Sequence, residues 1–289
     1  MTNEEKIKIL KENLQIFSTR QKNIKNQKNL TINEITEILS NDTNCLEKIS
    51  ELFSDEQLNL SPEDKIFFCK KICESSLKKQ IHSLLFIGSN EPTPAGAHSK
   101  ISFIKNKYND LAFERFSTFV PNAKADYATS FKESCENVTD GFSEYCIIPI
   151  TSSSDGRLMS FYSLLDRYEL KICSVTDIDD EETSKTIRYA CLCRNCHDPL
   201  EKKGAKGSVI FEFSAIDSTN DFLPLLLLCA KEAQAEIVNI DSIPVEYSSH
   251  LQRFFFSFRI PYQNALFFRL LTAISQENYN PIGIYKEIL

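Results

Sequence analysis

The sequence lacks the features that would direct it to a membrane or to a nucleic acid. No apolar run reaches the roughly 20 residues of a membrane-spanning helix, and LPLLLLCA, at residues 223–230, has the length of a core helix. The formal net charge is −7, and no basic stripe interleaved with aromatic residues occurs. We therefore expect neither a membrane nor a nucleic-acid partner.

The first ten residues, MTNEEKIKIL, lack the apolar segment of a secretory signal and are charged from Glu4 onward. This predicts a cytoplasmic protein whose 10 cysteines are free thiols rather than a disulfide framework. An apolar fraction of 42% and a charged fraction of 25% are typical of a soluble globular protein. The length of 289 residues leaves room for two or three domains.

Glycine is absent from residues 1–80, where apolar and charged residues alternate at helical spacing. One apolar stripe has four members, at Ile7, Leu10, Leu14 and Phe17. Further along, Ser61 and Pro62 are typical of a helix N-cap and first turn. We therefore predict three helices in this segment.

After residue 80 the pattern changes to an alternation of strands and helices. The predicted strands cover 83–88, 112–119, 144–150 and 170–176, and the predicted helices cover 97–108, 125–138 and 157–168. Such alternation favours an α/β layer with a mainly parallel sheet. A ligand pocket would then lie at the carboxyl ends of the strands.

The last part of the chain predicts the order βαββαβ, which is the ferredoxin-like order. Its strands fall at 207–214, 236–246, 252–260 and 282–288, and its helices at 221–235 and 265–276. The run Phe254-Phe255-Phe256 places a large ring on both faces of one strand. We expect a homodimer with Phe255 or its neighbours at the contact, because exposed apolar faces and strand edges are usually interfaces. The alternative is that the preceding lobe covers this face within one chain.

The stretch CLCRNCHDP contains four residues that are able to bind metals or haem, at Cys191, Cys193, Cys196 and His197. The spacing of the last three matches covalent haem attachment, and all four are possible zinc ligands. However, TIRYACLCR alternates as a strand does, and a structural zinc site usually uses two separated ligand pairs. We predict a strand here, and neither a metal nor a cofactor, with zinc as the alternative.

Several stretches, in this order, resemble prephenate dehydratase, the enzyme that converts prephenate to phenylpyruvate, with its C-terminal amino-acid-binding ACT domain. FIGSNEPTPAGAHSKISF is similar to the family's first strand and glycine-rich turn, and it puts Ser99 at the motif serine. CIIPITSSSDGRLMSFYSLLD is similar to its substrate-handling element. This element keeps Ser153, whereas Thr151 and Ser152 stand where the family has glutamate and asparagine.

The resemblance continues in TIRYACL, which is similar to a strand that returns to the first lobe and carries Thr186 and Arg188. The family implies a second lobe before this strand, and here only SVTDIDDEETSK stands in its place. The resemblance therefore implies a cleft with one wall missing. Dehydration of prephenate requires a pocket that excludes water, which a single lobe does not provide.

The C-terminal stretches EIVNIDSIPVEY and PIGIYKEI are similar to the ACT ligand motif and to its last strand. The resemblance implies amino-acid binding by two groups of residues, namely Asp221, Phe222, Leu223, Asp241 and Ser242. The helical N-terminus resembles a chorismate mutase domain in its helix pattern, with Arg20 and Gln80 as the possible site residues. That chemistry uses arginine forks to hold a dianion, and Arg20 is the only arginine before residue 100.

The sequence thus predicts an α/β protein with three parts. These are a helical segment at 1–80, a single periplasmic-binding-protein-like lobe with a mainly parallel sheet at 81–200, and a βαββαβ, ferredoxin-like ACT domain at 201–289. The predicted function is that of a catalytically degenerate relative of the phenylalanine-biosynthesis enzymes, which acts in regulation, small-molecule sensing or assembly. The alternative is an active chorismate mutase or prephenate dehydratase with an altered residue set. The expected partners are a second copy, bound through the ACT-like sheet, and an amino acid.

Overall fold

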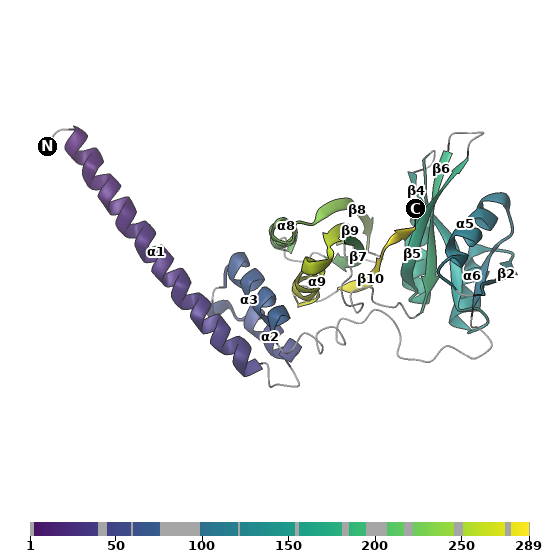
Figure 1. Cartoon of the computed structure of the whole chain (residues 1–289), viewed down its shortest axis with the longest axis horizontal. Helices are drawn as coiled ribbons and strands as arrows, with labels where there is room; N and C mark the ends of the chain where they lie inside the picture. Colours follow the sequence, from purple (N-terminus) through teal and green to yellow (C-terminus); the bar gives the residue numbers. More distant parts are fainter. Residues whose placement is uncertain are drawn as a thin grey trace. The chain divides into compact units, whose positions relative to one another are not determined.

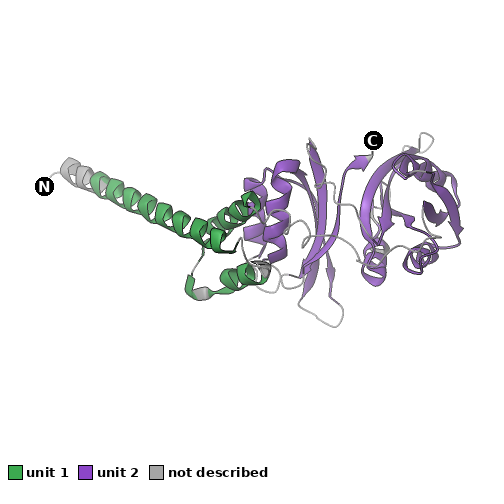
Figure 2. Ribbon diagram, turned by 60° about the horizontal axis from the view of Figure 1, so that its bottom comes forward, with its two compact units in different colours: residues 1–83 green, residues 84–289 purple. Residues whose placement is uncertain are grey.

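The computed structural model describes residues 3–39, 45–58, 60–75, 99–120, 122–153, 156–180, 185–194, 207–216, 222–245, 251–274 and 279–288. The chain divides into two compact units, Met1–Ser83 and Leu84–Leu289, which Figure 2 shows in green and purple. The predicted strand at 83–88 lies outside the described residues. No described helix is long and apolar enough to cross a membrane.

Unit 1 is helical, as predicted. Its helices are α1 (Asn3–Leu39), α2 (Cys45–Ser54) and α3 (Pro62–Glu74), and a short 3-10 turn covers Glu56–Leu58. The N-terminus of α3 forms the predicted cap: the Asp64 amide donates to the Ser61 hydroxyl at 3.2 Å, and the Ser61 amide donates to the Asp64 carboxylate at 3.0 Å. Lys28 of α1 binds the same carboxylate at 3.0 Å.

The core of unit 1 lies at the C-terminal end of α1, beside α2 and α3 (Figure 1). From residue 11 onward, Ile32, Thr36 and Leu39 are the buried side chains of α1. Their spacing of four and three residues places them on one helix face. Ile49 and Phe53 of α2, and Ile66, Phe68 and Ile72 of α3, are also buried in this unit.

Unit 2 begins with an α/β lobe. Its elements are β1 (Lys100–Ile104), α5 (Lys107–Ser117), β2 (Lys124–Ala128), α6 (Phe131–Thr139), β3 (Tyr145–Ser152), β4 (Gly156–Arg157), α7 (Met159–Tyr168), β5 (Lys171–Asp180) and β6 (Lys185–Cys193). The strand order is β2-β1-β3-β6-β5. β2, β1 and β3 are parallel, whereas β6 is antiparallel to both β3 and β5. The α/β class is confirmed, and the sheet is mixed rather than mainly parallel because a hairpin joins β5 to β6.

The segment between residues 97 and 119 forms its elements in the opposite order to the prediction. The predicted helix at 97–108 contains β1, and the predicted strand at 112–119 lies mostly in α5. Asn106 begins α5 as its N-cap, because its side chain accepts a hydrogen bond from the Asn109 amide at 2.9 Å. The predicted helix at 125–138 also begins too early, because β2 extends to Ala128.

The C-terminal part of unit 2 has the predicted βαββαβ order. Its elements are β7 (Ser208–Ile216), α8 (Phe222–Glu232), β8 (Glu236–Pro244), β9 (Gln252–Pro261), a 3-10 turn (Tyr262–Asn264), α9 (Ala265–Ile274), β10 (Asn280–Tyr285) and the short β11 (Glu287–Ile288). The strand order β10-β7-β9-β8 is antiparallel throughout. This arrangement is a ferredoxin-like sheet with α8 and α9 on one face (Figure 1).

Phe255 lies inside the chain, and its predicted place at a homodimer contact is therefore wrong. Phe256 and Phe258 of β9 face the helices and contact Phe222 and Phe268, respectively. Phe255, on the opposite face, is only 2% exposed and stacks on Tyr162 of α7 with ring centroids 3.8 Å apart. The α/β lobe covers this face of the ferredoxin-like sheet, which was the alternative expectation.

The two parts of unit 2 share one sheet. β10 pairs in parallel with β5 at Gly283 and Ile172, and β11 continues along β5. A Cβ atom on Gly283 would lie 2.5 Å from the carbonyl oxygen of Ile172. Glycine is required at this position because the two backbones approach too closely for any side chain.

Candidate functional site

The predicted residues of β3 and β6 come together where β3 ends. The Ser153 amide donates to the Thr186 carbonyl at 2.9 Å, and the Thr186 amide donates to the Ser153 hydroxyl at 3.0 Å. The Thr186 hydroxyl donates to the Asp179 carboxylate of β5 at 2.6 Å. Ser152 pairs with Ile187 in the β3–β6 ladder. These groups stand at the carboxyl end of β3, where a pocket was expected.

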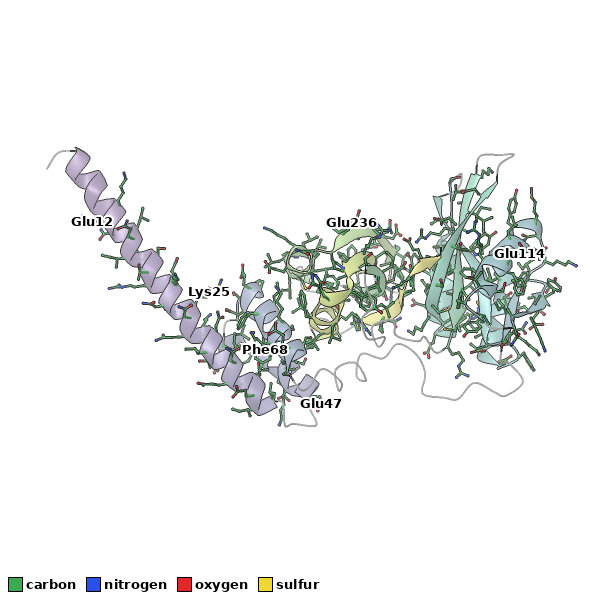
Figure 3. The ribbon with its side chains drawn as sticks, in the orientation of Figure 1. Glu12, Lys25, Glu47, Phe68, Glu114 and Glu236 are labelled. Atoms are coloured by element: carbon green, nitrogen blue, oxygen red, sulfur yellow. The ribbon has the colours of Figure 1, made fainter. Side chains whose placement is uncertain are left out.

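Arg188, the next predicted residue, belongs to an ion network that links four strands and β11. Its guanidinium donates to Asp177 of β5 at 3.4 Å and to Glu287 of β11. Glu287 also accepts a hydrogen bond from Arg259 of β9 at 3.0 Å. Arg259 also binds Glu236 of β8 at 3.1 Å, and Figure 3 labels Glu236. Charges of opposite sign therefore alternate across the junction of the two parts of unit 2.

The network shifts the pKa values of its two inner carboxylates in opposite directions. Burial would raise the pKa of Glu287, but the hydrogen bonds and charges of Arg188 and Arg259 outweigh it, so this pKa lies below its ordinary value. Burial raises the pKa of Asp177, and the charges of Glu287 and Asp179 add to this, against the opposing effect of Arg188. Arg188 therefore serves mainly as the counter-charge of Glu287.

A buried polar pair lies on neighbouring strands. Glu212 of β7 is buried, and the Tyr285 hydroxyl of β10 donates to its carboxylate. Burial, followed by the charge of Glu212, raises the pKa of Tyr285 well above its ordinary value. Ser257, also buried, pairs with Glu212 across the β7–β9 ladder. The face of the ferredoxin-like sheet that meets the lobe therefore contains hydrogen-bonded polar groups as well as apolar ones.

Ser99, the predicted motif serine, lies at the opposite end of the sheet. It precedes β1, its amide donates to Glu144 at 2.9 Å, and its φ is 64°. Because β1 runs parallel to β3 with Ile101 beside Tyr145, Ser99 is about 30 Å from Ser152 along the strand direction at about 3.3 Å per residue. The structure therefore does not bring Ser99 to the site of Ser153 and Thr186.

The predicted ligand residues of the C-terminal part are dispersed. Phe222 is buried among the aromatic rings of Phe213 and Phe256. Asp241 of β8 is half-buried and accepts a hydrogen bond from Asn239, and Ser242 beside it is exposed. Leu223 and the mutase candidate Arg20 are also exposed. Asp221 and Gln80 lie outside the described residues.

Cys191 and Cys193 are buried in β6, which is the predicted strand. Cys196 and His197 lie outside the described residues. Within the described ranges, no group of three or more His, Cys, Asp or Glu side chains is arranged to hold a metal ion.

The connection between β5 and β6, next to Thr186 and Ser153, is short. β5 ends at Asp180 and β6 begins at Lys185, so residues 181–184 are all that joins them. The nearby side chains of Ser153, Asp179 and Lys185 are exposed. The polar groups at the end of β3 therefore face solvent, where an electrostatic contact is weak compared with one in a closed pocket.

Sequence reasoning missed Asp177, Glu212, Arg259 and Glu287. Two of these carried a usable signal, because Glu212 in VIFEFS and Arg259 in FFFSFRI are charged residues in otherwise apolar strands. A charge at such a position requires a partner. The identity of the partner depends on the strand pairing, which is not visible in the sequence.

The geometry defines an α/β lobe that shares its sheet with a ferredoxin-like unit. No protein-family model and no curated protein matches the chain. A solved structure described as GqqA, a novel type of quorum quenching acylase, is 19% identical with a TM-score of 0.52, and the match covers 65% of this chain and 95% of that one. A prephenate dehydratase from Streptococcus mutans is 14% identical with a TM-score of 0.51, and the match covers 66% of this chain and 99% of that one. The chain has a prephenate-dehydratase-like fold.

Proposed function

We propose that this protein is a non-catalytic cytoplasmic relative of the prephenate dehydratases, in which the α/β lobe is structural and the C-terminal part serves as an ACT-type sensing and assembly module. The observation that carries the proposal is the state of Arg188. The resemblance puts this arginine in the substrate site, and here it is bound by Asp177 and Glu287. A substrate dianion would have to displace two carboxylates to reach it.

The short β5–β6 hairpin supports the same proposal. Catalysis of the dehydration and decarboxylation of prephenate depends on preorganised donors in a site from which water is excluded. The hydroxyl groups of Ser153 and Thr186 instead hydrogen-bond within an exposed strand end. Four residues between β5 and β6 leave no chain for a second wall at this point.

The sensing role rests on the C-terminal part. Asp241, on the edge strand β8, is half-buried and holds the Asn239 amide. A carboxylate in this position is able to bind an ammonium group, as expected for an amino-acid ligand. The apolar residues Ile237, Val238 and Ile240 on the same strand are exposed. An edge strand with exposed apolar side chains is suited to pair with a second copy of the chain.

The enzymatic part of the proposal is tested with the purified full chain and prephenate. We expect phenylpyruvate to form no faster than in the spontaneous reaction. Steady turnover that Thr186→Ala or Ser153→Ala removes would contradict the proposal, and would favour the active enzyme with an altered residue set. Ser242→Ala, which changes an exposed hydroxyl outside the lobe, is the matched control.

The sensing part is tested by a thermal-shift screen of the amino acids. We expect one or more of them to raise the melting temperature of the wild type, and Asp241→Asn to abolish the shift. Glu236→Gln, which neutralises an exposed carboxylate on the same strand, should leave the shift in place. The absence of a shift with all amino acids would remove the sensing role.

A further inference from the structure

A carboxylate in the core of unit 2 has no cationic side chain as its partner. Glu212 of β7 is 4% exposed, and it accepts a hydrogen bond from the neutral hydroxyl of Tyr285. In the described part of the chain, no lysine, arginine or histidine forms an ion pair with Glu212. The two arginines of the junction, Arg188 and Arg259, bind Glu287 instead. A buried carboxylate is costly unless an opposite charge compensates it, so Glu212 requires a further partner.

Two hydroxyl groups lie on the same face of the sheet as this carboxylate. Ser257 of β9 stands directly opposite Glu212 in the β7–β9 ladder, and Ser214 follows Glu212 by two residues on β7. Because side chains alternate along a strand, all three belong to one face. The Cβ atoms of residues directly opposite each other are about 5 Å apart, so the oxygen atoms of Glu212 and Ser257 are within reach of one common ligand.

The hydroxyl of Ser214 is a second uncompensated group. Ser214 is 0% exposed, and its Oγ atom forms no hydrogen bond with any described residue. Ser257, beside it on the neighbouring strand, is 3% exposed. Buried polar atoms nearly always bind a protein group, a water or an ion. A buried hydroxyl of this kind, two residues from a carboxylate without a counter-charge, therefore indicates a position where a small ligand binds.

Aromatic rings close this position on the side of the α/β lobe. Phe255 stands opposite Ser214 in the β7–β9 ladder and stacks on Tyr162 of α7, with ring centroids 3.8 Å apart. The two rings are 2% and 1% exposed. Because they exclude bulk water, Glu212 attracts a positive charge here more strongly than a carboxylate at the surface would.

We propose that Glu212, Ser214 and Ser257 bind a monovalent metal cation, Na⁺ or K⁺, in the core of unit 2. Hard cations take oxygen ligands, and oxygen is the polar atom of all three side chains. The single carboxylate balances one positive charge, whereas a divalent ion would leave an excess charge buried in the core. The cation supplies the counter-charge of Glu212 and ties β7 to β9. The site does not depend on the proposed function.

The first test measures the melting temperature of the full chain at pH 7 in NaCl, KCl or choline chloride of equal ionic strength. Choline is too large for a position among three buried side chains, so it controls for screening by salt. The cation that binds should raise the melting temperature by about 3 °C at ten times its dissociation constant, and the rise should saturate. Equal melting temperatures in the three salts would overturn the proposal and would leave a proton or a water as the partner of Glu212.

The second test locates the ion. Glu212→Gln should abolish the difference between the salts, and Ser214→Ala should raise the half-saturating concentration about tenfold, because one ligand of a charged group is lost. Glu236→Gln, which neutralises an exposed carboxylate of the same sheet, is the matched control and should keep the wild-type salt dependence.

If Glu212→Gln does not fold, Ser214→Ala decides the outcome. A wild-type salt dependence in this variant would place the ion elsewhere and overturn the proposal. An amino-acid screen without any thermal shift would remove the proposed sensing role and leave the salt results unchanged.

Discussion

At the scale of single residues, Glu287 is the central group of the ion network. It is the only one of the described carboxylates that binds two arginines from two different strands, Arg188 of β6 and Arg259 of β9. Glu287 itself lies on β11, which pairs with β5. A side chain in this position fixes the register of the junction between the two parts of unit 2. Removing it leaves both guanidinium groups without their shared counter-charge.

Glu287→Gln should lower the free energy of unfolding at pH 7 by about 1.5 kcal/mol, because hydrogen bonds to charged groups contribute about that much. Glu236→Gln removes the other carboxylate bound to Arg259, but that carboxylate is largely exposed. The control should therefore change stability by less than about 0.5 kcal/mol. Urea unfolding of the two variants and the wild type checks this, and equal effects of the two variants would contradict the central role of Glu287.

The stability difference between the wild type and Glu287→Gln should depend on pH in a defined direction. The pKa of Glu287 is lowered from 4.5 in the folded protein. Its stabilising contribution is therefore complete above pH 4.5 and is lost as the pH falls through the lowered value. The difference in stability between wild type and Glu287→Gln should be constant from pH 7 to about 5 and should shrink below pH 4.5. A difference that grows on acidification would show that the carboxylate is not ionised in the folded protein.

At the scale of the elements, the sequence predicted helices and strands correctly where its apolar residues followed a single period, either that of a helix or that of a strand. The βαββαβ order could be predicted because each strand is rich in aromatic or β-branched residues and each helix has a continuous apolar face. The segment 97–119 was predicted wrongly because it contains both the two-residue period of a strand and the helical period of about 3.6 residues. KISFI alternates as a strand does, whereas Asn109, Ala112 and Phe116, the buried residues of α5, have helical spacing. The capping side chain of Asn106 was the signal that would have separated them.

Phe255 shows what sequence periodicity leaves undetermined. Alternation along β9 correctly placed this ring on the face away from α8 and α9, but it could not show what covers that face. The cover is Tyr162, and the two residues are 93 positions apart in the sequence. Contacts over such a separation depend on the tertiary arrangement, which for this chain includes the close approach of β10 to β5 at Gly283.

Phe255→Ala should destabilise the fold by about 3 to 5 kcal/mol, which is the usual cost of truncating a buried aromatic side chain. The mass of the assembly should stay the same, because the ring packs inside one chain. Phe254→Ala, which truncates a half-buried ring on the next position, should cost about 1 kcal/mol. Chemical unfolding together with light scattering distinguishes the two roles. A lower mass with unchanged stability in Phe255→Ala would place this ring at an interface after all.

At the scale of the whole molecule, the candidate site could be predicted only in part. Ser152, Ser153 and Thr186 lie close together because they belong to the adjacent strands β3 and β6 or follow directly on β3. Ser99 does not join them, because it precedes β1, and the parallel register of β1 with β3 places it at the other end of the sheet. The partners of Arg188 come from β5 and β11, and no local pattern in the sequence connects these strands.

The edge strand β8 replaces Phe255 as the proposed contact of the sheet with a second copy of the chain. β8 ends the strand order of the sheet and has no lysine or arginine, and its one proline, Pro244, is the last residue of the strand. Ile240→Glu in the full chain should give a monomer, because the new charge occupies an exposed apolar position on the pairing edge. Leu111→Glu is the matched control, since Leu111 is 38% exposed and Ile240 39%. Sedimentation equilibrium should show a dimer for the wild type and for this control, and a monomeric wild type would show that β8 does not pair.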